Sequence, residues 1–136
     1  MTTSSVVYQG NLRTLATHIK SGSTLETDAP VDNNGKGMKF SPTDLTATSL
    51  ACCMFTLIGI HAEKNDIPLG SIHSEVTKTM ASNPRRISRI AITIQFGGKE
   101  YSDREKKILE HAARTCPVAL SLHPEIEQAV EFRYSG

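Results

Sequence analysis

Cysteine is the residue type in this sequence best suited to covalent chemistry, and the chain contains three cysteines. Cys116 directly precedes Pro117, which places it at or next to the N-cap of a following helix. Unpaired N–H groups and the positive end of the helix dipole favour a thiolate at that position. The motif therefore indicates redox chemistry at Cys116, while a structural cysteine that ends a helix is an equally good interpretation of the motif alone.

Cys52 and Cys53 are adjacent and lie in an apolar segment with helical character. Consecutive residues of an α-helix point about 100° apart, so only one of these two thiols can face a given pocket. For a buried cysteine such as Cys53, packing as a small core residue is the commoner role. Residue type and position alone therefore do not separate a reactive Cys53 from a structural one.

Zinc binding is the main chemical alternative to thiol redox chemistry. The conceivable ligands are Cys52, Cys53, His61, His111 and Cys116. Structural zinc sites favour two cysteines separated by about two to four residues, and the adjacent pair here cannot easily converge on one ion. We therefore expect no metal site and no bound cofactor.

The whole chain limits the classes of function. Its 136 residues suit a single domain over 1–136, and its formal net charge of +1 gives no support for a nucleic-acid or anionic-membrane partner. The N-terminus lacks a signal-peptide pattern, and the longest apolar stretch, 45–60, is shorter than the roughly 18 to 20 residues that span a bilayer. We therefore expect a cytoplasmic protein without a transmembrane helix. The odd number of cysteines argues against a structural disulfide framework.

The element that must position Cys53 is a helix from Ser41 to about Asn65. Ser41 is a suitable N-cap, Pro42 suits the first helical position, and Asp44 completes a variant capping box. Apolar residues cover nearly every side of this helix, so it must be buried nearly all round. A helix of about 24 residues is roughly 36 Å long, about the diameter of the whole domain, and one chain can hardly cover it. We therefore expect an obligate homodimer in which a second copy covers one side.

Beyond this helix, alternating apolar residues predict strands, and capping signals predict two more helices. Ser102 and Glu105 form a full capping box, and Pro117 suits the first position of a short helix. The order β-β-β-α-β-β-α-α-β indicates an α+β fold. The predicted elements are an antiparallel hairpin or meander within 5–27, strands at about 74–80, 89–96 and 128–134, and helices at about 102–115 and 117–122.

Five short motifs join these elements into one pattern: Phe40-Ser41-Pro42-Thr43-Asp44-Leu45, Ser49-Leu50-Ala51-Cys52-Cys53-Met54, Lys78-Thr79-Met80, Pro84-Arg85-Arg86-Ile87 and Cys116-Pro117-Val118. They combine a buried helix that opens with Ser-Pro, a cysteine in the middle of that helix, and a distant Cys-Pro-Val. Taken together, they resemble the OsmC/Ohr family of organic hydroperoxide reductases and osmotically inducible proteins, over nearly the whole chain.

This resemblance implies an OsmC-like, intertwined homodimer in which long buried central helices are flanked by antiparallel sheets. It also implies a thiol-dependent peroxidase in which Cys53 attacks an organic hydroperoxide and Cys116 then forms a disulfide with the oxidised Cys53. The implied reductant is an external dithiol of the lipoyl type. The alternative is a non-catalytic dimeric module of the same fold that binds a ligand or a partner protein. Cys52 stands where relatives often have glycine or alanine and is assigned to packing.

Peroxidases of this family also use a glutamate directly after the proline of the helix start and an arginine from an N-terminal turn or loop. Here Thr43 stands at the glutamate position, and Asp44 follows it. The loop over 32–39 contains no arginine, which leaves Arg13 or Lys36 as the candidate cation. We therefore take Arg13 and Asp44 as auxiliary site residues.

Arg85 and Arg86 are two further auxiliary candidates. They lie between two predicted strands, where a turn is expected, and such a turn is usually a solvated loop. Two arginines beside an apolar cleft could instead hold the carboxylate of a charged reductant.

Overall fold

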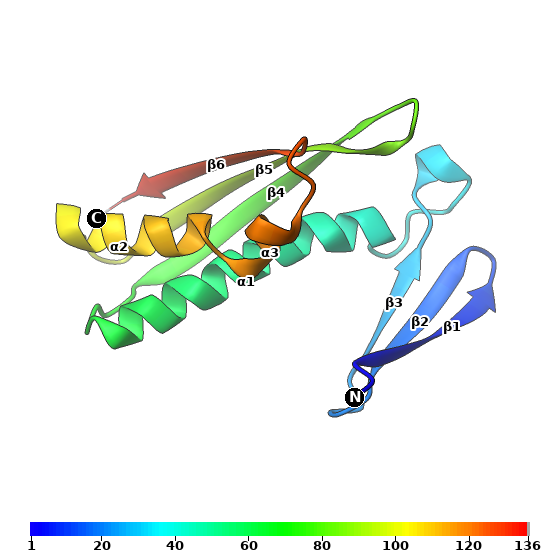
Figure 1. The fold of residues 1–136 in the computed structure, drawn as a ribbon, viewed down its shortest axis with the longest axis horizontal. Helices are drawn as coiled ribbons and strands as arrows, with labels where there is room; N and C mark the ends of the chain where they lie inside the picture. The colour runs from blue at the N-terminus through cyan, green and yellow to red at the C-terminus, as the bar shows by residue number, and fades with distance from the viewer. Residues whose placement is uncertain (136) are drawn as a thin grey trace. The chain divides into compact units, whose positions relative to one another are not determined.

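The computed structural model describes residues 1–135 (Figure 1). Its internal contacts divide the chain into a first compact unit, Met1–Thr46, and a second unit that begins at Ala47. Each unit is described by itself below. A single domain over 1–136 stays a prediction.

The first unit is an antiparallel meander of three strands, which confirms the predicted arrangement of 5–27. Arg13 of the second strand lies opposite Asp28 of the third. The strands are β1 (Ser4–Gly10), β2 (Arg13–His18) and β3 (Thr24–Asp28), and a short 3-10 helix, η1 (Val31–Asn33), follows them.

Apolar side chains on this small sheet remain exposed within the chain. Val6, Val7 and Tyr8 of β1 are 63%, 59% and 64% exposed, and Leu25 of β3 is 47% exposed. Val6 and Val7 are consecutive, so they point to opposite faces of the strand. A sheet of three strands needs a packed hydrophobic face to be stable. The residues of this unit leave these apolar side chains exposed, so we expect another surface to pack against the sheet.

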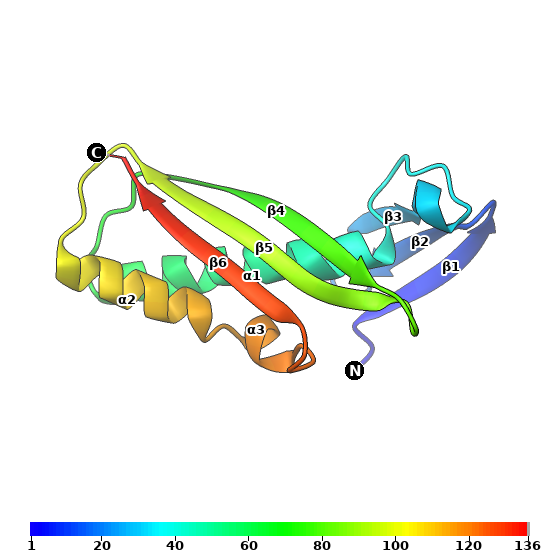
Figure 2. The ribbon, with the colours of Figure 1, turned by 90° about the horizontal axis from the view of Figure 1, so that it is seen from above.

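The second unit places helices on one face of a second three-stranded sheet, as Figures 1 and 2 show. The order of strands and helices along the chain agrees with the predicted one. The elements are α1 (Pro42–Lys64), whose first turn belongs to the first unit, β4 (Ser71–Ala81), β5 (Arg86–Gly97), α2 (Asp103–Arg114), α3 (Pro117–Ser121) and β6 (Glu127–Tyr134).

The second sheet is mixed, which differs from the expectation of antiparallel sheets. Strand β5 lies in the centre and pairs antiparallel with β4 but parallel with β6. Helices α2 and α3 lie between β5 and β6 in the sequence. They form the crossover that a parallel pair requires, because a tight hairpin can join only antiparallel strands.

The inner face of β5 forms the centre of the core. Ile90, Ile92, Ile94 and Phe96 alternate along the strand, and each is at most 1% exposed. This alternation agrees with the period-two pattern expected for a half-buried sheet. They pack in one cluster with buried residues of α1 and α2, including Leu50, Met54, Ile58 and Leu109.

Helix α1 is buried on one face within the chain, not nearly all round. Cys52, Thr56 and Ile60 on its other side are exposed. Among residues 1–135, α1 is the one helix long and apolar enough to cross a membrane, but the core helix of a globular protein meets the same criteria. Its buried residues are Ala47, Leu50, Ala51, Met54, Ile58 and Ala62.

We expect Ile94→Ala to lower the free energy of unfolding by about 2–5 kcal/mol, because truncation of a fully buried side chain leaves a cavity. Thr93→Ala, on the opposite face of the same strand, is the matched control and should cost less than about 1 kcal/mol. Urea unfolding followed by circular dichroism measures both changes. Equal losses for the two variants would contradict the assignment of the inner face of β5 to the core.

Candidate functional site

The helix start that positions Cys53 is held by reciprocal hydrogen bonds between Ser41 and Asp44. The backbone N–H of Asp44 donates to Ser41 Oγ at 3.0 Å, and the backbone N–H of Ser41 donates to Asp44 Oδ2 at 3.0 Å. The predicted variant capping box is therefore confirmed. Asp44 serves the helix start through this contact, and its proposed auxiliary role in chemistry stays a prediction.

Cys116 is the N-cap of α3, as the Cys-Pro motif predicts. It adopts an extended backbone conformation with Pro117 at the first helical position. Its Sγ accepts a hydrogen bond from the backbone N–H of Ala119 at 3.4 Å. The Cys116 side chain is 0% exposed and belongs to the central core cluster.

The fold brings Cys116 and Cys53 together from two different helices. Cys53 of α1 is half-buried and packs against the core cluster that contains Cys116. Cys53 is close enough to Cys116 to contribute to the raised pKa of the Cys116 thiol. A disulfide between two such neighbours requires their Cα atoms to lie within about 7 Å.

The surroundings of Cys116 keep its thiol protonated. Burial raises the pKa of Cys116, the backbone N–H of Ala119 opposes this, and the neighbouring Cys53 raises the pKa further. This pKa shift is opposite to the lowered pKa that the N-cap position alone would give, because the desolvation of a buried thiolate outweighs its stabilisation by the helix N-terminus. Within this pair, Cys53 is the more exposed residue.

Cys52 takes no part in this arrangement. All three cysteines are free, but Cys52 is exposed while Cys53 faces the core. This separation follows from the rotation of about 100° between adjacent helical residues. Among residues 1–135, no three His, Cys, Asp or Glu side chains lie close enough together to hold a metal ion.

Arg13, an auxiliary candidate in the first unit, is paired with Asp28. The distance from Arg13 Nη2 to Asp28 Oδ2 is 3.6 Å, and Asp28 is fully buried. The backbone N–H of Met38 also donates to Asp28 Oδ2, at 3.0 Å, whereas Asp28 Oδ1 has no hydrogen-bond partner among the described residues. The sequence analysis missed Asp28. The available signal was its place at the end of β3, directly across from Arg13 in β2.

Arg86 is engaged in the turn between β4 and β5. Its Nη1 donates to the carbonyl oxygens of Ser82 and Pro84, at 3.0 and 2.9 Å. Arg85 is exposed in the same turn. A role for these two arginines in holding a reductant therefore remains a prediction, and Arg86 has a structural function independent of it.

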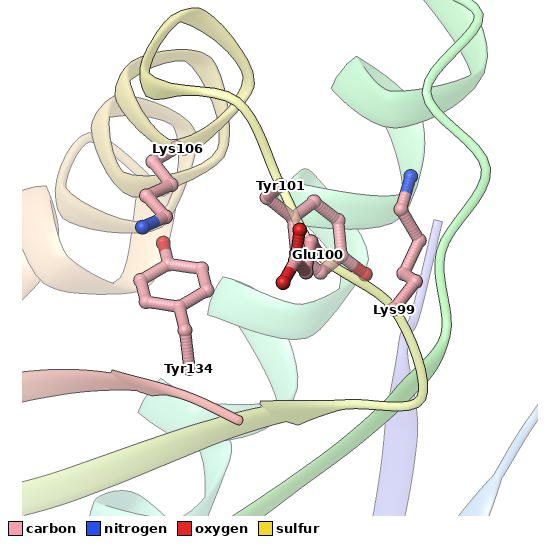
Figure 3. A pocket seen from close by; sticks show the side chains of 5 residues that line it. All are labelled: Lys99, Glu100, Tyr101, Lys106 and Tyr134. Carbon is pink, nitrogen blue, oxygen red and sulfur yellow. The ribbon is translucent and has the colours of Figure 1, made fainter. Parts of the chain in front are cut away.

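A pocket with a volume of about 330 Å³ opens near the start of α2 (Figure 3). The ammonium groups of Lys99 and Lys106 lie 4.6 Å from the ring centres of Tyr101 and Tyr134, respectively. Lys106 belongs to the first turn of α2, and Cys116 follows the last turn, so about 12 Å of helix lies between them. The sequence analysis did not predict this pocket, and it is distinct from the thiol pair.

Known structures share this fold. A crystal structure from Psychrobacter arcticus, provisionally described as an osmotic stress induced and detoxification response protein, is 54% identical. The alignment covers 98% of this chain and 96% of that chain, with a TM-score of 0.93. An OsmC-like protein from Mycoplasma pneumoniae is 16% identical over 98% of this chain and 96% of that chain, with a TM-score of 0.80.

An organic hydroperoxide resistance protein, OsmC, from Legionella pneumophila is 15% identical over 98% of each chain, with a TM-score of 0.72. Among curated proteins, none matches the sequence. The sequence profile of the OsmC family, described as OsmC-like protein, matches residues 35–131. Because this match spans most of the chain and the fold agrees with it, the chain belongs to the OsmC/Ohr family.

Proposed function

We propose that this protein is a thiol-dependent peroxidase that reduces organic hydroperoxides, with Cys53 as the attacking thiol and Cys116 as its disulfide partner. The observation that carries the proposal is the proximity of two free thiols of unequal burial, both packed at the same core cluster. A solvent-accessible sulfur can meet a peroxide, and a buried, protonated thiol beside it can resolve the product. The name of the Legionella relative, an organic hydroperoxide resistance protein, points to the same class of substrate.

The reaction has two steps on the protein. The Cys53 thiolate attacks the terminal oxygen of ROOH, so that an S–O bond forms and the O–O bond breaks. The alkoxide takes a proton from water and leaves as ROH, while Cys53 becomes a sulfenic acid. The Cys116 sulfur then attacks the Cys53 sulfur, and the hydroxyl group leaves as water with the Cys116 proton.

An external dithiol of the lipoyl type completes the cycle by thiol–disulfide exchange. Its first thiolate attacks the Cys53–Cys116 disulfide, and its second thiol displaces the protein sulfur, so that the reductant becomes the disulfide. No bound cofactor takes part in this cycle. We place the reaction in the cytoplasm, where dithiol reductants keep protein thiols reduced.

We also propose that the working form is a homodimer. Two surfaces support this: the exposed apolar side chains of β1 and β3, and the side of α1 that carries Cys52, Thr56 and Ile60. Exposed apolar side chains that gather on one surface of a small protein often mark an interface. A two-fold partner would present the same surfaces in return, as in other obligate homodimers.

Treatment of the reduced protein with one equivalent of cumene hydroperoxide should remove two hydrogen atoms from each chain, because Cys53 and Cys116 form an intrachain disulfide. Intact-mass measurement and a thiol count test this. Cys53→Ser should abolish hydroperoxide consumption, and Cys116→Ser should stop at a sulfenic acid that dimedone traps. Cys52→Ser is the matched control and should react as the unmodified protein does.

Full hydroperoxide consumption by Cys53→Ser would reject the peroxidase proposal. Unchanged thiols and unchanged mass in the unmodified protein would favour the non-catalytic binding module instead.

Arg13 is our proposed source of positive charge for the thiolate and the peroxide. Arg13→Gln should slow the first, single-turnover oxidation about tenfold or more, because it removes a positive charge that would stabilise the negative charge of the reacting thiolate and peroxide. Arg13→Lys keeps the charge and should retain more of the rate. Stopped-flow oxidation of the prereduced protein measures both. Arg85→Gln is the control for a general loss of positive charge. Wild-type rates for a folded Arg13→Gln variant would remove Arg13 from the mechanism.

A further inference from the structure

We propose that Asp28 is a positioning residue: its buried carboxylate holds the guanidinium group of Arg13 and fixes the direction in which the rest of that group is presented. Asp28 then acts through Arg13 and touches no substrate. The catalytic meaning of this role rests on the proposed function, in which Arg13 supplies positive charge. The ion pair itself lies within the first unit and can be measured without any turnover.

The carboxylate of Asp28 is buried and depends on few partners. Its side chain is 0% exposed, and it is the one charged side chain among the buried residues that the structure describes. Its Oδ2 accepts the backbone N–H of Met38 at 3.0 Å and lies 3.6 Å from Arg13 Nη2, whereas Oδ1 has no hydrogen-bond partner among residues 1–135. A buried charge is costly unless an opposite charge lies beside it. The carboxylate therefore relies on the positive charge of Arg13.

Strand register brings Arg13 and Asp28 together. Arg13 begins β2 and lies opposite Asp28, the last residue of β3, in the antiparallel pair of strands that Figure 1 shows side by side. Side chains directly opposite each other are on the same face of a sheet, with their Cβ atoms about 5 Å apart. The adjoining backbone supports this register, because the N–H of Ala29 donates to the carbonyl oxygen of Leu12 at 3.2 Å. The pair is thus set by the sheet and not by a flexible surface contact.

Asp28 also connects Arg13 to the segment that leads into α1. The backbone N–H of Asp28 donates to the carbonyl oxygen of Phe40 at 3.1 Å, and its side chain accepts the N–H of Met38. Phe40 directly precedes Ser41, whose hydroxyl oxygen caps the start of α1. One residue therefore contacts both the start of β2 and the segment before α1. A change at Asp28 should alter the place of Arg13 relative to this helix start.

The ion pair leaves part of the Arg13 guanidinium group for a second anion. Asp28 lies beside Nη2, and the side chain of Arg13 is 33% exposed. A guanidinium group is planar and rigid, so a carboxylate that holds one nitrogen also restricts the directions of Nε and Nη1. A side chain that is already ordered loses less conformational entropy when it binds a further group. Asp28 thus prepares Arg13 to meet a thiolate or the developing charge on a peroxide oxygen.

The first test measures the mobility of the Arg13 side chain by NMR relaxation of its Nε–H group, with the exposed Arg104 of α2 as the reference. The order parameter of Arg13 should be about 0.8 in the unmodified protein and should fall below about 0.6 in Asp28→Asn. Asparagine has the shape of aspartate and can still accept the Met38 N–H, so this variant removes the charge and retains the loop contact. Glu26→Gln removes an exposed charge from the same strand and should leave Arg13 unchanged.

Two results of this test would overturn the proposal. One is an Arg13 side chain in the unmodified protein that is as mobile as Arg104, and this result is decisive even if Asp28→Asn does not fold. The other is an unchanged order parameter of Arg13 in a folded Asp28→Asn protein.

The second test determines whether Asp28 acts through Arg13 in the reaction. Asp28→Asn should slow the single-turnover oxidation of the prereduced protein about tenfold, because a misplaced group loses much of its effect on the transition state. It should have no further effect in an Arg13→Gln background, since residues that act as one unit are not additive. Equal slowing in both backgrounds would indicate a structural role independent of Arg13 and would overturn the proposal.

The two tests separate this proposal from the proposed function. Suppose that Asp28→Asn releases the Arg13 side chain while Asp28→Asn and Arg13→Gln both react at the unmodified rate. That result would support the positioning by Asp28 and reject only the role of Arg13 in catalysis. If the unmodified protein consumes no hydroperoxide, the order parameters alone decide whether Asp28 positions Arg13.

Discussion

Cys116 lies at the junction where α2 ends and α3 begins, and the geometry of this junction determines what the thiol pair can do. Pro117 starts α3 and leaves Cys116 extended as its N-cap. At this N-cap position, the Cys116 sulfur accepts a hydrogen bond from the backbone N–H of Ala119. Cys116 also lies in the crossover between the parallel strands β5 and β6, where it belongs to the core cluster. The sulfur is therefore both desolvated and hydrogen-bonded, and its burial raises the pKa of the Cys116 thiol.

Helix α1 carries Cys53, the second thiol of the pair. The same helix also carries part of the surface proposed for the dimer interface. Its core face carries Leu50, Met54 and Ile58, which fix the helix against the sheet. Cys53 lies at the edge of this face, whereas Cys52 lies outside it. A second copy that covers the open side of α1 would thus border Cys53. Because the same helix carries the thiol and the uncovered surface, the proposed dimer and the proposed chemistry depend on one element.

Local signals predicted much of this structure from sequence alone. The Ser41/Asp44 and Ser102/Glu105 capping boxes gave both helix starts, and alternation along β5 gave its inner face. The features that local signals missed are set by tertiary contacts. The parallel pairing of β6 depends on a crossover, the direction of the pKa shift at Cys116 depends on burial, and the Arg13–Asp28 pair depends on strand register. Motif resemblance, not residue chemistry, singled out Cys53 as the candidate attacking thiol.

The unequal burial of the two sulfurs also gives a direction to the reduction step of the proposed cycle. In a Cys53–Cys116 disulfide, Cys53 is the sulfur that an external dithiolate can reach, so Cys116 is the leaving group. A buried thiolate is a poor leaving group, because burial raises its pKa. The N–H groups of Ala119 and Val118 act against this and stabilise the thiolate that departs. The N-cap of α3 would thus receive the negative charge when the proposed disulfide opens.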